Sequence, residues 1–140
     1  MFNLHENEIT FFYHPNRNDD RKALAYAESI GNYHVKKIDL TTNKLTETQI
    51  GVIADMLKVE IHELVDRSHP SYKTLDLDSN DNPAYDKEDI MTLLKNIPEL
   101  ITTPIAIIGK KGYRWKSADE MAKFCLEHFT THFERAKSNI

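Results

Sequence analysis

The first third of the chain alternates between a strand pattern and a helix pattern. Residues 9–13 are aromatic or β-branched, which predicts a β-strand, and the Pro- and Asn-containing residues 14–18 predict a loop. Apolar side chains then recur at helical spacing and predict an amphipathic helix, with Asp19 as its N-cap and Gly31 just after its end. Residues 33–40 predict a second strand.

The middle of the chain carries two strong helix starts. Thr46 and Gln49 stand three positions apart before an apolar helical face, which is the pattern of a capping box. Asp86 precedes a second face of this kind and is expected to cap it. Between these helices, residues 61–65 indicate a further short helix, and the polar, turn-rich residues 66–85 predict mostly loop.

The last third predicts a hairpin followed by a helix. Residues 104–108 form a continuous apolar run, as expected of a strand that is buried on both faces. The turn residues 110–112 separate this run from a hairpin partner at 113–115. Ser117 and Glu120 then have the spacing of a capping box, and the helix that they begin is expected to reach about residue 136.

The predicted order is β-α-β-α-α-α-β-β-α, which indicates an α/β protein with a mixed β-sheet flanked by helices. This is the plan of a thioredoxin-like fold that has a helical insertion between the second strand and the β-hairpin. We expect one domain over residues 1–140, because 140 residues suffice for a single hydrophobic core. The insertion would span about residues 45–99.

Composition and charge remove several classes of function. The net charge of −4 disfavours binding to nucleic acid by neutralisation of phosphates. No apolar run reaches the roughly 20 residues of a membrane-spanning helix, and residues 1–10 lack the features of a signal peptide. We therefore expect a cytoplasmic protein with no membrane partner. Cys125 is the single cysteine, so an intramolecular disulfide, a two-cysteine redox motif and a cysteine-rich zinc site are excluded.

Three weaker patterns have plain alternatives. Cys125, His128 and His132 can share one side of a helix and could hold a metal ion, but Cys125 lies in the middle of the apolar stripe, which favours packing. We therefore expect no metal site and a buried, slowly reacting thiol. Residues 76–80 begin like a calcium loop, yet the required glycine is missing. The basic residues near Trp115 form either a solvated hairpin or a surface for an acidic partner or nucleic acid: Lys110, Lys111, Arg114 and Lys116.

Four segments, in the same order, resemble the arsenate reductase family of the ArsC/Spx type. They are residues 13–24 (YHPNRNDDRKAL), 45–47 (LTE), 63–73 (ELV followed by PSYK) and 96–105 (NIPELI followed by TPI). The likeness extends over about residues 9–115. It implies a thioredoxin-like fold in which Pro104 follows a cis peptide bond and faces the loop after the first strand.

The resemblance also places the family's reaction centre, and here this sequence departs from the pattern. The nucleophilic cysteine of the family falls on Arg17 if the loop proline is matched, or on Asn18 if the start of the loop is matched with a one-residue gap. Neither residue can form a thiolate. His14 and Asn16 belong to the same loop and complete the candidate positions on this side of the site.

The arginines that bind the oxyanion in the family are also replaced. One falls on Thr103, immediately before Pro104, and the other falls on Asp66, with Arg67 one place away. Arginine suits this task because its planar guanidinium pairs with oxyanions through two hydrogen bonds. In addition, Asp19 and Asp20 put negative charge at the start of the helix that would otherwise favour a bound anion.

Two functions fit these residues. The first is a non-enzymatic protein that keeps the scaffold and binds a protein partner or a small thiol or anion, as Spx-type regulators in the family act through protein contacts. The second is an oxidoreductase or transferase that depends on glutathione or on a partner's thiol and acts at residues 16–18. The replaced cysteine and arginines favour the first function, for which no cofactor is implied; glutathione would serve the second.

Overall fold

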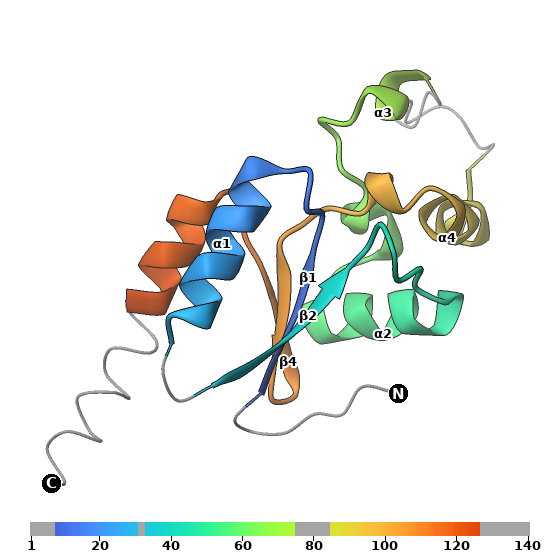
Figure 1. Cartoon of the computed structure of the whole chain (residues 1–140). Coiled ribbons are helices and arrows are strands. Elements are labelled where there is room, and N and C mark those ends of the chain that lie inside the picture. Colours follow the sequence, from blue (N-terminus) through green and yellow to red (C-terminus); the bar gives the residue numbers. More distant parts are fainter. Residues whose placement is uncertain (1–7, 31–32, 75–84, 127–140) are drawn as a thin grey trace, which may run out of the picture.

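A computed structural model describes residues 8–30, 33–74 and 85–126, and in them a mixed sheet lies between two layers of helices (Figure 1). The sheet has four strands in the order β2-β1-β3-β4. β1 pairs in parallel with β2 and antiparallel with β3, and β3 pairs antiparallel with β4. The strands are β1 (Glu8–Tyr13), β2 (His34–Asp39), β3 (Ile105–Ile108) and β4 (Lys111–Arg114).

The central strand β1 is buried from both sides because helices cover each face of the sheet. Ile9 and Phe11 face one layer and Phe12 faces the other, as the two-residue period of a strand requires. Parallel strands need a crossover connection, and α1 (Asn18–Glu28) supplies it between β1 and β2. The predicted mixed sheet with flanking helices is confirmed.

One layer consists of α1 and the helix over residues 118–126, which lie side by side (Figure 1). Both helices begin at the same end of the sheet, and the Asp19 carboxylate accepts a hydrogen bond from the backbone N–H of Ala118 at 3.3 Å. Their apolar faces form one core with the sheet, to which these residues contribute: Ile9, Phe11, Ala23, Ala27, Ala106, Trp115, Ala118 and Met121.

The other face is covered by the helices between β2 and β3. These are α2 (Glu47–Leu57), η1 (Ile61–Leu64), α3 (Pro70–Thr74), α4 (Lys87–Asn96) and η2 (Pro98–Leu100). The capping boxes at α2 and α4 form as predicted: Thr46 exchanges hydrogen bonds with Gln49, and Asp86 does so with Asp89. The larger core on this face includes Phe12, Ile105 and Ile107.

Two segments between these helices are paired through their backbones. Val65 and Ile101 form an isolated antiparallel bridge. The Asp66 N–H donates to the Leu100 carbonyl at 2.6 Å, and the Thr102 N–H donates to the Leu64 carbonyl at 2.7 Å. The turn after η1 is therefore fixed against the segment that leads into β3, and both lie opposite the start of α1.

Some predicted boundaries differ from the structure. The N-cap of α1 is Arg17, not Asp19, because the chain is already helical at Asn18. A short helix, α3, stands where a loop was predicted, and it buries Tyr72 against the core. β4 begins at Lys111, earlier than predicted, because the hairpin turns at Gly109, whose φ of 63° suits glycine.

The last predicted helix is present over residues 118–126, and the Ser117 hydroxyl accepts from the Glu120 N–H at 3.2 Å as expected. Three further predictions concern Gly31, residues 76–80 and the course of the last helix after residue 126. All three lie outside the described residues.

Candidate functional site

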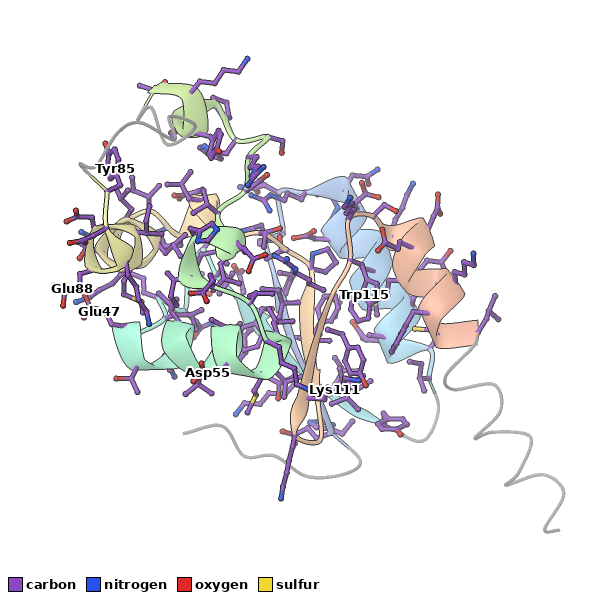
Figure 2. The ribbon with its side chains drawn as sticks, turned by 180° about the vertical axis from the view of Figure 1, so that it is seen from behind. Glu47, Asp55, Tyr85, Glu88, Lys111 and Trp115 are labelled. Atoms are coloured by element: carbon purple, nitrogen blue, oxygen red, sulfur yellow. The ribbon has the colours of Figure 1, made fainter. Side chains whose placement is uncertain are left out.

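A groove with a volume of about 930 Å³ lies where the start of α1, the turn after η1, the segment before β3 and the end of β4 meet. Its lining combines charged residues of both signs with the apolar side chains of Val65 and Trp115. Trp115 directly follows β4 and lies on the side of the sheet that carries α1 (Figure 2). Seven of the lining residues are Arg17, Asn18, Asp20, Asp66, Arg67, Thr103 and Lys116.

Arg17 connects three segments of this groove. Its guanidinium donates to the Thr103 hydroxyl at 2.8 Å, to the Glu99 carbonyl at 2.8 Å and, at 3.4 Å, to the Ile101 carbonyl. The same group forms an ion pair with Asp66, with 2.9 Å between Nη2 and Oδ2. Arg17 is the N-cap of α1, yet its side chain caps nothing, because the guanidinium reaches across to the other segments.

Asp20 is buried in the first turn of α1, with 1% of its surface exposed. Its Oδ2 accepts from the backbone N–H of His14 at 2.8 Å and from the Thr103 hydroxyl. Since Thr103 also accepts from Arg17, the hydroxyl links the cation to the buried carboxylate. This network joins the end of β1, the start of α1 and the residue before Pro104.

His14 is buried at the end of β1, and its Nε2 lies 3.0 Å from the Ile101 carbonyl oxygen. Because a carbonyl can only accept, Nε2 carries a hydrogen. Burial lowers the pKa of His14, and the charge of Arg17 lowers it further. The Ile101 hydrogen bond and the nearby carboxylates of Asp20 and Glu99 act in the opposite direction but are outweighed.

The Asp66 carboxylate is held at both oxygens. Oδ2 pairs with Arg17, and Oδ1 accepts from the backbone N–H and the hydroxyl of Ser68, at 3.0 and 2.6 Å. Arg67, the neighbouring cation, is exposed and lines the groove. The positive charge of Arg17 is therefore matched by an internal negative charge.

The remaining predicted positions are two exposed side chains and the peptide bond before Pro104. Asn16 and Asn18 are both exposed, and the Asn18 side chain accepts from Arg21 at 3.3 Å. The Thr103–Pro104 peptide bond is cis, as predicted. Thr103 faces the loop after β1, since it bonds to Arg17.

The structure thus gathers most of the predicted positions and adds others that the sequence reading missed. His14, Arg17, Asp66 and Thr103 share one network, whereas Asn16 stands outside it. The missed members are Asp20, as a buried acceptor, and Ser68. The burial of Asp20 has a signal in the sequence: positions 20, 23 and 27 lie on one helical face, and the other two are buried alanines.

Cys125 is half-buried rather than fully buried, so the burial prediction was too strong. Burial still raises the pKa of its thiol. Within the described ranges, no group of three or more His, Cys, Asp or Glu residues could hold a metal ion. His128 and His132, the two other members of the predicted cluster, lie outside these ranges.

In the part of the chain that the structure describes, no helix is both long enough and apolar enough to cross a lipid bilayer.

No protein-family model matches the sequence, and no curated protein is similar enough to count as a match. Solved structures do match. An arsenate reductase from Vibrio cholerae superposes with a TM-score of 0.73 at 15% identity, over 85% of this chain and 98% of that chain. An arsenate reductase (ArsC) related protein from Brucella melitensis gives a TM-score of 0.63 at 20% identity, over 84% and 94%.

A Staphylococcus aureus protein solved by NMR gives a TM-score of 0.65 at 23% identity, over 82% of this chain and 96% of that chain. The chain therefore has the thioredoxin-like fold of arsenate reductase structures, which confirms the fold that the sequence motifs implied. At these identities the likeness concerns the fold, and any function has to be argued from the site.

We predict that the Asp20 carboxylate contributes strongly to stability. Replacing it in Asp20→Ala leaves the His14 N–H and the Thr103 hydroxyl without their acceptor, and each buried unsatisfied group costs about 1–3 kcal/mol. We expect a loss of about 2–4 kcal/mol in the free energy of unfolding, measured by urea denaturation. The control Asp19→Ala removes an exposed neighbouring carboxylate and should cost about 1 kcal/mol or less. Equal losses in both variants would contradict the prediction.

We also predict that His14 makes the protein less stable in mild acid. Because its pKa in the folded state lies below the usual value of 6.5, the unfolded chain takes up a proton that the folded chain does not. The stabilisation is complete above about pH 6.5 and falls as the pH drops towards the folded-state pKa, by at most about 1.4 kcal/mol per pH unit.

The measurement is thermal or urea unfolding between pH 7.5 and 5.5. His14→Gln keeps an N–H donor for the Ile101 carbonyl but cannot titrate, so its stability should fall less than that of the wild type. His62→Gln, at an exposed histidine of η1, should behave like the wild type. If His14→Gln lost stability with pH as steeply as the wild type, the assignment to His14 would be wrong.

Proposed function

We propose that this arsenate-reductase-like chain has lost the nucleophilic cysteine and acts by binding a protein partner at the groove. One observation carries the proposal: the Arg17 guanidinium stands where the motifs align the nucleophile, and it is bonded to Asp66, Thr103 and the Glu99 carbonyl. An arginine with these contacts is a structural cross-link, and it offers no lone pair for attack.

The chemistry of arsenate reduction supports the proposal. A reductase needs a thiolate to attack arsenic, and cations to hold the anion while it does so. Asn18, the other position that the motifs allow for the thiol, is an exposed amide. The two aligned arginine positions hold Thr103, whose hydroxyl bonds to Asp20, and Asp66, which is negatively charged.

A protein partner is favoured over a small anion. The guanidinium of Arg17 in this network is already paired with Asp66, so a small oxyanion would have to compete with an internal carboxylate. The groove edge nevertheless carries exposed cations, Arg67 and Lys116, and its lining includes the largely buried apolar side chains of Val65 and Trp115. Mixed charged and apolar contacts of this kind are typical of surfaces that bind proteins.

A second candidate is a reaction that uses glutathione or a partner's thiol at residues 16–18. The volume of the groove, about 930 Å³, favours it, because ligand pockets occupy roughly 300–1,000 Å³. In this case the ligand brings the sulfur, and the protein supplies only the binding surface. The test is a calorimetric titration with glutathione. Weak or absent binding would favour the partner-binding function.

We predict that the wild-type protein does not reduce arsenate when glutathione and glutaredoxin are supplied. Arg17→Cys restores a thiol but leaves the oxyanion site without its cations. Loss of two charge-assisted contacts of about 1.5–3 kcal/mol each weakens oxyanion binding by roughly two to four powers of ten. Arg17→Cys and Asn18→Cys alone should therefore give little turnover, and Arg17→Cys combined with Asp66→Arg should give more.

The matched control is Arg17→Ser, which is close in size to the cysteine variant but has no thiol. It should be inactive, both alone and in combination with Asp66→Arg. Arsenite production is measured against a reaction without protein. Wild-type turnover above that background would overturn the proposal. Full activity from a single cysteine substitution would show that the missing cations matter less than argued.

A further prediction concerns the binding surface itself. A partner captured by the immobilised wild-type protein should be lost when the charge at the groove is reversed in Arg67→Glu. The control Lys95→Glu reverses the charge of another exposed residue, on α4 and outside the groove lining, and should retain the partner. Quantitative mass spectrometry of the three captures makes the comparison. A set of bound proteins that is unchanged by Arg67→Glu would mean that the groove is not the contact surface.

A further inference from the structure

Three donors converge on the carboxylate of Asp66. Arg17 Nη2 lies 2.9 Å from Oδ2, and the Ser68 N–H and hydroxyl donate to Oδ1 at 3.0 and 2.6 Å. A guanidinium, a backbone amide and a hydroxyl that point at one anionic group are the donors with which proteins bind oxyanions. Here the anion that they hold is a side chain of the same protein.

The backbone around Asp66 is fixed by bonds that do not involve this carboxylate. The Asp66 N–H pairs with the Leu100 carbonyl at 2.6 Å, and Val65 bridges to Ile101. Arg17 is held independently by the Thr103 hydroxyl and the Glu99 carbonyl. Removal of the Asp66 carboxylate therefore leaves Arg17 and the backbone at residue 66 close to their present positions, with Ser68 two residues further along the same turn.

We infer that Asp66 is an intramolecular anion that closes an oxyanion-binding cradle made by Arg17 and Ser68. A tethered carboxylate competes with any free anion at a high effective concentration and loses little entropy on binding. The wild-type protein is therefore closed to free phosphate-like oxyanions, and the cradle becomes available only when Asp66 moves away or is removed. This deepens the proposed function, on which it rests, because it gives the reason why the groove favours a protein partner over a small anion.

The side chains of the ion pair are partly accessible, 27% for Arg17 and 19% for Asp66. An anion can therefore reach the guanidinium from the groove once the carboxylate is gone. Arg67 follows Asp66 in the chain, lines the same groove and adds a second cation near the cradle. The ligand class is a tetrahedral oxyanion, and inorganic phosphate is a suitable probe because it is not reduced.

The test is a titration with inorganic phosphate at constant ionic strength, balanced with chloride, and followed by calorimetry. Asp66→Ala should bind phosphate at least about tenfold more tightly than the wild type, the factor that corresponds to one charge-assisted contact. Asp66→Ala combined with Arg17→Gln should lose this gain. Glu120→Gln also removes one negative charge from the groove lining but frees no donor of the cradle, so it should bind phosphate no better than the wild type.

Asp66→Asn serves as a second variant, because its amide oxygen can still accept from Ser68 and hold the turn. It should show a smaller gain than Asp66→Ala, since only Arg17 is released. The inference is overturned if the wild type binds phosphate as tightly as Asp66→Ala. It is also overturned if neither folded Asp66 variant gains phosphate affinity, or if Glu120→Gln gains as much. These readouts measure binding alone, so they are separate from the arsenate turnover that tests the proposed function.

Discussion

The Asp20 carboxylate lies inside the protein at the first turn of α1, and the geometry of the groove follows from the way it is satisfied. A buried charge costs several kcal/mol unless donors surround it. The donors come from two places that are distant in sequence, the His14 N–H at the end of β1 and the Thr103 hydroxyl before β3. Once both bonds form, the start of α1 and the segment before Pro104 are fixed relative to each other.

Arg17 extends this arrangement to the helices between β2 and β3. It reaches from the N-cap of α1 to Thr103 and the Glu99 carbonyl, and then to Asp66 in the turn after η1. The charges alternate along the path, from the Asp20 carboxylate through a hydroxyl to the guanidinium and on to a second carboxylate. Alternation of this kind lets ionised groups lie close together at low dielectric without net repulsion. It also gives the positive charge of Arg17 a negative partner, Asp66.

The fold alone does not decide the function of this protein, so the arrangement of charged side chains in the groove matters. Structures named as arsenate reductases share the architecture, and the same scaffold can support other roles when the side chains at one end of the sheet change. The proposed binding role and the proposed closed cradle both depend on the same ion pair, in which Arg17 stands at the start of α1 and Asp66 faces it. The charged side chains of the groove therefore serve mainly to connect the start of α1 with the turn after η1 and the segment before β3.

The sequence by itself determined the features that depend on neighbouring residues. The capping boxes at Thr46 and Asp86 involve residues three positions apart, and the buried run of β3 is continuous, so local pattern sufficed for both. The motifs around Pro104 also anticipated the fold and the cis bond. Only the tertiary structure decided the rest. Arg17 meets partners 82 to 86 residues away, and no periodicity records such pairs. Asp20 was expected only to place negative charge at the start of the helix, because its partner Thr103 stands 83 residues further along the chain.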